Sequence, residues 1–381
     1  MVARVEHREA VRYALYAMKK RVLIVQNEVM SYRRTVYDAL GEYYDVTVLH
    51  SGKPAVEPGD RFREIITPKT QWWNFHFQRR VPEHLDPAQF DAAILMFDLW
   101  WLNSIRAMLR RRKPPLILWG HRHSLNPAAN VIRYWLMKRA DAQLLYGDED
   151  LHEILLNRIP RETVFVAPNT QHVSNSQDTS GLPGKHRLIF VGRLQRIKRV
   201  HVLIEAFYEA LPSIGKDVVL SIVGNGFEEE RLKAQAQKLG LKDRIQFHGE
   251  VRSDDDLLPI FRESLAYFTP GAVGLGLLHA FAYGVTCVTT LRPRQRHGQE
   301  FMNLKHDVNS LVIESEANLA ETIVTLCNDP KLVRRLGAVA YRTYQETRRL
   351  DQMVDGFRNS IEYAIRRARL ANAVESHASR S

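Results

Sequence analysis

The sequence predicts an α/β protein made of two doubly wound, Rossmann-like domains that face a cleft. Three observations predict this architecture. Short apolar runs alternate with helical patterns from residue 21 onward, a stretch rich in Ser, Gly, Pro and Asn interrupts them near residue 180, and the alternation then begins again. Such alternation is typical of open parallel sheets covered by helices. The 381 residues suffice for two domains of roughly 150 residues each.

The expected strands are short runs of Val, Ile, Leu and Ala that precede a polar turn and a helical stretch. In the first half they are 22–25, 46–49, 92–96, 116–119, 142–145 and 164–166, and in the second half 188–191, 218–223, 245–247, 266–268 and 285–290. Parallel strands place their carboxyl ends at one edge of a sheet, so ligands are expected there.

The same pattern divides the chain into segments. We expect an N-terminal extension over 1–20, a first domain over 21–173, a linker over 174–186, a second domain over 187–345, a C-terminal helix over 346–371 that returns to the first domain, and a disordered tail over 372–381. Residues 18–21, Met-Lys-Lys-Arg, lead directly into a strand as a protein start does. We therefore interpret 1–17 as an extension or a misplaced start.

The composition limits the kinds of binding partner and the cell compartment that we expect for this protein. The net charge of +11 suits an anionic partner such as a nucleotide, a phospholipid headgroup or nucleic acid. Cys287 and Cys327 form neither a disulfide framework nor a metal-type spacing, which favours a reducing cytoplasm. We find no secretory signal, and the longest apolar stretch, 92–102, is shorter than the ~20 residues that span a bilayer. No nucleic-acid-binding motif is present, so nucleic acid is not an expected partner.

A basic loop follows the first strand of the second domain. The strand ends at Gly192, and Arg193 and Lys198 follow before the next helix. Arginine offers a planar fork to phosphate oxygens and lysine a point charge, so together they can neutralise a diphosphate leaving group. The alternative is an ordinary solvated basic loop.

Two glycine-containing turns follow later strands. Gly224 and Gly226 flank an asparagine between a strand and a helix, an arrangement that lets a nucleotide approach the backbone, although taken alone it is better explained as a plain βα turn. Small residues over 270–276 precede an apolar helix that contains His279 and ends at Gly284, so its free N–H groups can face an anion. By base rate, His279 alone is more often a satisfied core histidine than a ligand.

The order of these motifs resembles the C-terminal half of glycosyltransferase family 4, whose members are retaining enzymes of the GT-B fold. The resemblance runs from 188 to 313 and includes Phe247-His248-Gly249. The first half is more loosely similar to a polysaccharide-synthesis branch, through Arg33, residues 119–121, 140–147 and 168–170.

The resemblance implies a role for each matching residue. Arg193 and Lys198 would bind the donor diphosphate, and His121 would face the donor sugar as a third catalytic residue. Arg33 would lie on the acceptor side, in the first domain. The remaining donor-binding positions would be Gly192, Gly224, Gly226, Gly249, Val251, Gly274, Leu275, His279 and Glu300. No metal ion or other cofactor is expected beyond the nucleotide-sugar substrate.

One segment departs from the family pattern. Many members carry two glutamates eight positions apart where this chain has Gly271 and His279, with Val-Gly-Leu between them. Glycine cannot orient a sugar, whereas His279 can hydrogen-bond ribose hydroxyls. Glu300 resembles a family Gly-x-x-Glu segment and can supply a lost carboxylate; the alternative is an exposed acid at a helix start.

These expectations define a function and its rivals. We expect a retaining glycosyltransferase with a glycan or lipid-linked acceptor, working in the cytoplasm or at the inner membrane face, where the basic stretch of Arg106 and 110–113 can meet anionic lipid. The runner-up is another GT-B enzyme, such as a nucleotide-sugar epimerase. A nicotinamide dehydrogenase would need a complete glycine fingerprint, which this sequence lacks. The acidic triplets at 148–150 and 254–256 are interpreted as helix caps rather than metal ligands.

Overall fold

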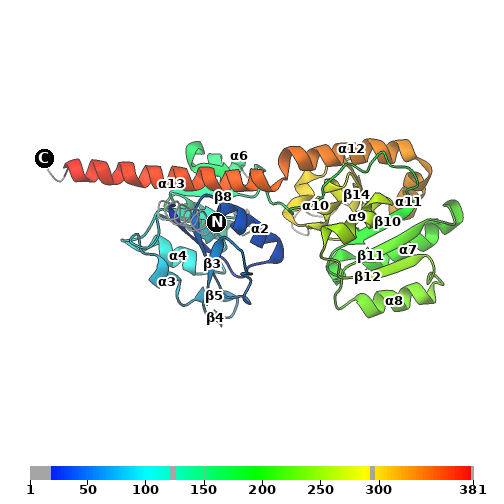
Figure 1. The fold of residues 1–381 in the computed structure, drawn as a ribbon, viewed down its shortest axis with the longest axis horizontal. Helices are drawn as coiled ribbons and strands as arrows, with labels where there is room; N and C mark the ends of the chain where they lie inside the picture. The colour runs from blue at the N-terminus through cyan, green and yellow to red at the C-terminus, as the bar shows by residue number, and fades with distance from the viewer. Residues whose placement is uncertain (1–18, 121–125, 150, 292–296, 379–381) are drawn as a thin grey trace, which may run out of the picture. The chain divides into compact units, whose positions relative to one another are not determined.

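The computed structural model describes residues 19–120, 126–149, 151–291 and 297–378, which divide into two compact units. One unit contains the chain up to Pro168 and from Leu350 onward, and the other contains Asn169–Arg349. Each unit is a parallel sheet with helices on both faces, so the predicted two-domain α/β fold is confirmed (Figure 1). The predicted extension lies outside the described residues apart from positions 19 and 20.

The first domain has a seven-stranded parallel sheet in the order β3-β2-β1-β6-β7-β8-β9. Its strands are β1 (Arg21–Val25), β2 (Asp45–His50), β3 (Phe62–Ile66), β6 (Ala92–Met96), β7 (Leu116–Trp119), β8 (Ala142–Leu145) and β9 (Val164–Val166). Helices α2 (Ser31–Leu40) and α13 (Leu350–Ala378) cover one face. Helices α3 (Val81–His84), α4 (Asn103–Met108), α5 (Pro127–Met137) and α6 (Leu151–Leu156) cover the other.

The second domain has a six-stranded parallel sheet in the order β12-β11-β10-β13-β14-β15. Its strands are β10 (Arg187–Val191), β11 (Val219–Val223), β12 (Ile245–Gly249), β13 (Ser264–Phe268), β14 (Thr286–Thr290) and β15 (Ser310–Ile313). One face is covered by α7 (Val200–Ala210), α8 (Glu229–Lys238) and α11 (Leu319–Asn328). The other is covered by α9 (Asp254–Arg262), α10 (Gly276–Ala282) and α12 (Pro330–Thr347).

Two boundaries differ from the prediction. The segment 174–186 is not a linker but part of the second domain, where the Ser174 hydroxyl donates to Asp254 and the Lys185 ammonium donates to the Ser264 carbonyl. Its Ser and Asn residues resemble a linker because they are turn formers, but here they bond to α9 and its neighbours. Helix α13 continues to Ala378, so 372–378 is helical rather than a disordered tail; alanine at 371 and 373 favours this extension.

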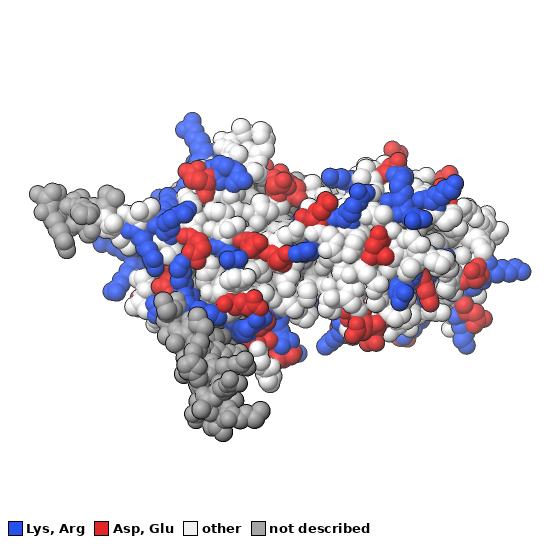
Figure 2. Space-filling view, turned by 45° about the horizontal axis from the view of Figure 1, so that its top comes forward, with Lys and Arg blue, Asp and Glu red and all other residues white. Residues whose placement is uncertain are grey.

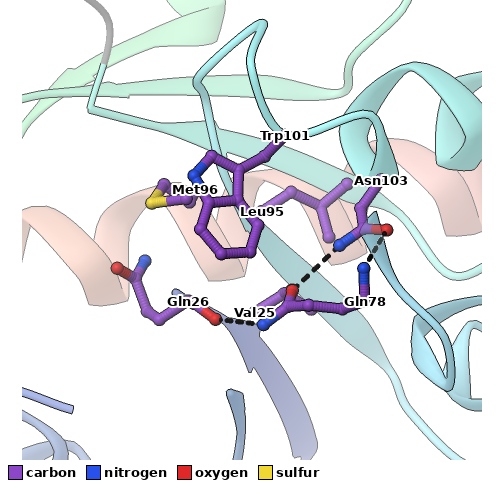
Figure 3. Close-up of a pocket in the computed structure, with 7 residues that line it drawn as sticks. All are labelled: Val25, Gln26, Gln78, Leu95, Met96, Trp101 and Asn103. Atoms are coloured by element: carbon purple, nitrogen blue, oxygen red, sulfur yellow. Dashed lines mark hydrogen bonds between the residues drawn. The ribbon is translucent and has the colours of Figure 1, made fainter. Parts of the chain in front are cut away.

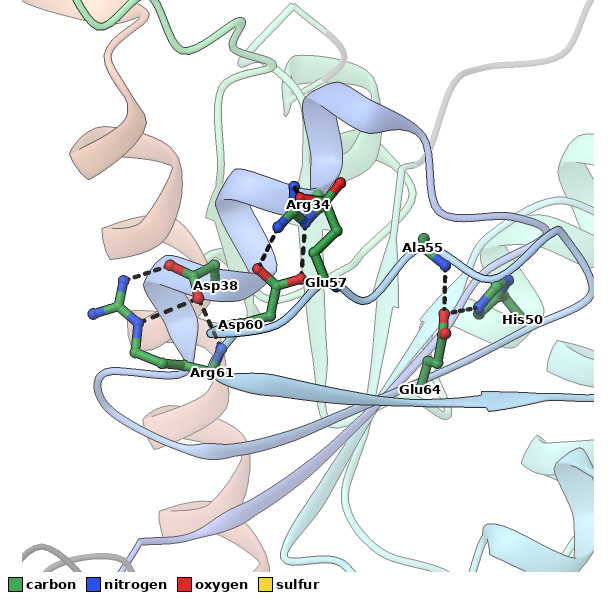
Figure 4. A network of polar contacts seen from close by, with 8 residues as sticks. All are labelled: Arg34, Asp38, His50, Ala55, Glu57, Asp60, Arg61 and Glu64. Atoms are coloured by element: carbon green, nitrogen blue, oxygen red, sulfur yellow. Dashed lines mark hydrogen bonds and ion pairs between the residues drawn. The ribbon is translucent and has the colours of Figure 1, made fainter. Parts of the chain in front are cut away.

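A polar network fixes α2 against the edge of the first sheet (Figure 4). The Arg34 guanidinium donates two 2.8 Å hydrogen bonds to Asp60, and Arg61 binds Asp38. These hydrogen bonds lower the pKa of both carboxyl groups. Because each charge is paired with its neighbour, we interpret the network as structural. Over the face shown in Figure 2, Lys and Arg are interspersed with Asp and Glu.

No helix in the described ranges combines the length and the apolar character that crossing a bilayer requires.

Candidate functional site

The strand order of the second sheet reverses between β10 and β13, so the loops that follow these two strands leave in opposite directions. In open parallel sheets, ligands bind in the crevice at such a switch point, outside the carboxyl ends of the strands. The loop after β10 contains Gly192, Arg193 and Lys198, and the loop after β13 contains Gly274 and Leu275. The structure therefore brings the two predicted phosphate-binding segments to one position.

The predicted glycines pack the loops against one another. A Cβ atom at Gly224 would lie 2.0 Å from the carbonyl oxygen of Gly192, and one at Gly226 would lie 2.3 Å from that of Leu194. Both glycines also have positive φ, which side chains rarely adopt. Gly249 has φ of 67° and its carbonyl accepts a hydrogen bond from the Gly224 amide, with Val251 partly buried beyond it. Close loop packing thus accounts for Gly224 and Gly226 before any ligand is considered.

Lys198 joins the two loops of the switch point. It ends a short 3-10 turn after β10, and its ammonium donates a 2.7 Å hydrogen bond to the Ala272 carbonyl in the loop after β13. Burial lowers the pKa of Lys198, and the nearby carboxylate of Glu300 opposes this shift. A Cβ atom at Gly274 would lie 3.0 Å from the Lys198 ammonium nitrogen, so the backbone there is close to the charge.

Arg193, five residues before Lys198 in the same loop, carries a second positive charge. Its side chain is exposed, and among the described residues it has no hydrogen-bond partner. It contributes to the lowered pKa of Glu250, which is mainly caused by hydrogen bonds from Arg252. Arg193 is therefore available to an anionic ligand, whereas Lys198 is already held in place.

On this backbone Gly271 leaves no space for the glutamate that the family resemblance would place there. A Cβ atom there would lie 2.0 Å from the carbonyl oxygen of Ile197. The amides of Gly271 and Ala272 donate to the carbonyls of Lys198 and Ile197, which explains the close approach. The departure from the family pattern is therefore built into the contact between the two loops.

Glu300 is buried, with 6% of its surface exposed, so the alternative of an exposed acid at a helix start is wrong. It lies in the 3-10 turn Gln299–Asn303 and accepts a hydrogen bond from the Asn169 side chain. His297 stacks on Phe301 and accepts a 3.3 Å hydrogen bond from the Val273 amide. A carboxylate, an imidazole and an amide thus support the loop that contacts Lys198. Sequence reasoning missed His297 and Asn169.

His279 faces an acid rather than an apolar core. Its Nε2 atom lies 3.6 Å from the Asp254 carboxylate, which also accepts hydrogen bonds from Ser174. Burial raises the pKa of Asp254, but hydrogen bonds from His279 and Ser174 outweigh it, and the pKa is lowered. Asp254 is the first residue of α9, whose N-cap is Ser253, so residues 254–256 lie in the first turn of the helix and do not themselves cap it. Among the described residues, no group of three or more His, Cys, Asp or Glu is arranged to hold a metal ion.

In the first domain, Arg33 lies buried in an aromatic surrounding. Its guanidinium carbon lies 5.1 Å, 4.9 Å and 5.2 Å from the ring centroids of Tyr32, Trp119 and Tyr146, and one of its nitrogens donates to the Met353 sulfur. Within the described ranges no carboxylate pairs with Arg33. Cation–π contacts therefore hold this charge. His121, the third predicted catalytic residue, lies outside the described residues.

A small pocket marks the switch point of the first sheet, between β1 and β6 (Figure 3). The Gln78 side chain donates a 2.6 Å hydrogen bond to the Gln26 carbonyl and accepts a 2.9 Å bond from Asn103, while Trp101 forms one wall. The Gln26 side chain is 8% exposed, and its amide nitrogen has no hydrogen-bond partner among the described residues. Sequence reasoning missed this pocket, although Gln26 follows β1 as Gly192 follows β10.

Comparison with known proteins matches residues 174–343 to the model of the family described as glycosyl transferases group 1. The N-acetyl-alpha-D-glucosaminyl L-malate synthase of Bacillus anthracis is 26% identical over 182 residues, which are 47% of this chain and 46% of that protein. The chain thus matches about half the length of this curated relative.

Solved structures resemble nearly the whole chain. A glycosyltransferase from Rickettsia africae has a TM-score of 0.70 at 14% identity, covering 91% of this chain and 99% of the other. HepE from Anabaena, solved with UDP and glucose, has a TM-score of 0.65 at 15% identity, covering 90% and 99%. At these identities the likeness shows the fold. The second domain therefore carries the sequence signature of glycosyl transferases group 1, and the chain as a whole has the GT-B fold.

Proposed function

We propose that this protein is a glycosyltransferase that moves a sugar from a nucleoside-diphosphate donor to a glycan or lipid-linked acceptor in polysaccharide synthesis. The observation that carries the proposal is the basic loop at the β10/β13 switch point, within the part of the chain that matches glycosyl transferases group 1. The binding of UDP and glucose by HepE, a protein of the same fold, supports a nucleotide-sugar donor.

Lys198 and Arg193 act on the diphosphate in different ways. The Lys198 ammonium has three N–H donors, of which one is used by the Ala272 carbonyl, so two remain for phosphate oxygens. The anchor to Ala272 fixes where this charge stands, and preorganised charge is what stabilises a leaving group. Arg193 is exposed and adds a planar fork that can close on the diphosphate after it binds.

The remaining second-domain residues are assigned to the nucleotide and the donor sugar. His279 offers an imidazole to the ribose hydroxyls, and the carboxylate of Asp254 orients it. The backbone of Gly274 and Leu275 borders the site, and a side chain at 274 would contact the Lys198 ammonium. Glu300 is assigned as a positioning residue. Its carboxylate accepts a hydrogen bond from Asn169 and lies close enough to Lys198 to affect the pKa of the ammonium group.

The reaction we propose retains the anomeric configuration. The bond between the anomeric carbon and the diphosphate oxygen breaks, and the acceptor hydroxyl forms its new bond on the same face of the sugar. The hydroxyl proton passes to an oxygen of the leaving diphosphate, so the chain need not supply a base. His121 is assigned to the donor-sugar side, as the family resemblance implies.

The acceptor is assigned to the first domain. The pocket at the β1/β6 switch point is lined by three side-chain amides, the Trp101 indole and the apolar side chains of Val25, Leu95 and Met96, with no charged side chain among these lining residues. The pocket has room for about one hydroxyl group, and side-chain amides that donate and accept suit such a group. The buried Gln26 amide nitrogen can donate a hydrogen bond to a hydroxyl oxygen of the acceptor. Arg33 supports this acceptor-side region through the ring of Trp119.

The cell compartment we propose is the reducing cytoplasm, where Cys287 and Cys327 remain free thiols.

A donor screen tests the proposal. Thermal unfolding is measured with a panel of uridine and guanosine diphosphates and their sugars; one of them at 100 times its dissociation constant should stabilise the protein by about 2.7 kcal/mol. The stabilising nucleotide sugar is then incubated with lipid-linked and soluble glycans. Release of nucleoside diphosphate together with a glycosylated acceptor supports a transferase, whereas conversion of the sugar without acceptor indicates an epimerase.

A further inference from the structure

The hairpin of β4 (Lys69–Trp72) and β5 (Phe75–Gln78) exposes two adjacent tryptophans at its turn. Trp72 is 71% exposed and Trp73 is 82% exposed, and their rings stack with centroids 5.9 Å apart. Trp73 has φ of 53°, a conformation that bulky residues rarely adopt. Neither exposure nor backbone preference explains tryptophan here, so an external partner for the two rings is the simplest account.

The two faces of the hairpin have different surroundings. Gln78 lies on the face that turns toward the amide pocket, where His76 stacks on Trp101. Trp72 pairs directly with Phe75 in the antiparallel register, and Phe77 follows two residues later, so these three share the opposite face. We call this opposite face, with Trp73 and Trp100, the aromatic face. Trp100 belongs to it because its ring lies 5.3 Å from Phe75 while remaining 49% exposed.

Arginines border the aromatic face. The Arg106 guanidinium lies 5.3 Å from the centroid of the Phe77 ring, and the Arg79 side chain donates to the Thr70 hydroxyl of the neighbouring strand. Exposed arginines 110–112 follow directly after helix α4, which contains Arg106. Throughout the described ranges, none of these arginines is paired with a carboxylate. Arg79 and Arg106 thus contact the hairpin, and the basic stretch continues along the chain from Arg106.

We infer that the aromatic face and its arginines dock this protein on an anionic lipid bilayer, with Trp72 and Trp73 in the headgroup region. Indole rings prefer the membrane–water interface because they combine a large apolar body with one polar N–H group. Each Lys or Arg close to the membrane surface is attracted to anionic headgroups by about 1 kcal/mol. A neutral sugar would explain the indoles but not the unpaired arginines around them, so the combination favours lipid. The inference does not depend on the transferase reaction.

Vesicle binding by the full chain tests this inference. The protein is sedimented with vesicles of phosphatidylcholine alone and of phosphatidylcholine mixed with phosphatidylglycerol, and tryptophan emission is recorded. We expect binding to the anionic vesicles with a blue shift in emission. Binding should weaken strongly near 1 M salt, where the Debye length falls to about 3 Å. The double variants Trp72→Ala/Trp73→Ala and Arg79→Glu/Arg106→Glu should each lower the affinity on the order of tenfold or more.

Matched control variants distinguish a specific loss of vesicle binding from a general effect of removing an indole or reversing two charges. Trp135→Ala removes an exposed indole from α5, outside the aromatic face, and Lys238→Glu/Arg262→Glu makes the same charge change in the second domain. Both should bind vesicles as the wild type does. Stabilisation by the nucleotide found in the donor screen should be unchanged in every variant, which keeps this test independent of the proposed reaction.

Three results would overturn the inference. One is equal binding to neutral and anionic vesicles, and another is unaltered binding by the two hairpin variants. The third is a neutral oligosaccharide that binds the wild type but not Trp72→Ala/Trp73→Ala while anionic vesicles do not bind at all, which would make the aromatic face a carbohydrate platform.

Discussion

The carboxyl edges of the two sheets have the same topology but different chemistry. Each sheet reverses its strand order once, between β1 and β6 in the first domain and between β10 and β13 in the second. At the first reversal the pocket is lined by amides, an indole and apolar side chains, whereas at the second the loops contain glycines and a partly buried lysine. A shared fold therefore fixes where a ligand binds, and the loop residues decide whether it is a neutral hydroxyl or a diphosphate.

The largest expected effect is at the charged edge. Lys198→Ala should lower kcat/KM by ~10²–10³, because a preorganised donor to the leaving group is worth roughly 3–4 kcal/mol. The measurement is steady-state turnover with the donor and acceptor found in the screen. Lys238→Ala, which removes an exposed lysine at the end of α8, is the control and should be neutral. Near-normal turnover of Lys198→Ala would show that Lys198 does not stabilise the leaving diphosphate at the second switch point.

The second effect concerns the contact between the loops. Gly271→Ala places a Cβ atom 2.0 Å from the Ile197 carbonyl, so the loop must shift. We expect a loss of about 1–3 kcal/mol, which is typical of overpacking, and a fall in the unfolding temperature of roughly 2–4 °C per kcal/mol. Gly181→Ala serves as the control, since its nearest neighbour would be an arginine side chain at 3.5 Å. If both variants melt alike, the tight contact is not real.

The third effect is at the neutral edge. Gln26→Leu removes the buried amide nitrogen from the first-domain pocket. We expect the KM for acceptor to rise about tenfold, which corresponds to one hydrogen bond of roughly 1.4 kcal/mol, while the KM for donor is unchanged. The control, Gln237→Leu, changes an exposed glutamine of α8 in the second domain. If the KM for donor rises instead of the KM for acceptor, the pocket does not bind the acceptor.

The smallest effect separates structural charge from functional charge. Asp60 accepts two hydrogen bonds from Arg34, and these lower its pKa below the unfolded value of ~3.9. Its stabilising contribution is therefore present above about pH 4 and is lost as pH falls through the lowered pKa. Asp60→Asn should reduce the free energy of unfolding by about 1 kcal/mol at neutral pH. Chemical denaturation should show this difference shrink in acid, with no change in turnover at neutral pH.

The sheets could be predicted from the sequence because their central strands are continuous apolar runs. All the strands predicted from such runs are present. Two edge strands were missed: β3, whose sequence Phe-Arg-Glu-Ile-Ile mixes charges with apolar residues, and β15, whose apolar run is only three residues long. The hairpin was missed because β4 is fully exposed and therefore has no buried pattern.

The candidate site was predictable in part. The glycines and cations stand next to the strands that position them, so Arg193 and Lys198 could be selected from local sequence. The contact of Gly271 with Ile197 and the burial of Glu300 by Asn169 join residues far apart in the chain, and no local pattern indicates them. The 174–186 segment was misassigned for the same reason, since its partners lie on α9 and β13.

The most direct test of the account is calorimetric titration with a nucleoside diphosphate and with the corresponding nucleoside, using wild type and Lys198→Ala. If the loop at the β10/β13 switch point holds the diphosphate, the wild type binds the diphosphate far more tightly than the nucleoside, and Lys198→Ala loses most of that difference while its nucleoside affinity stays the same. An equal preference for the diphosphate in both proteins would contradict the account.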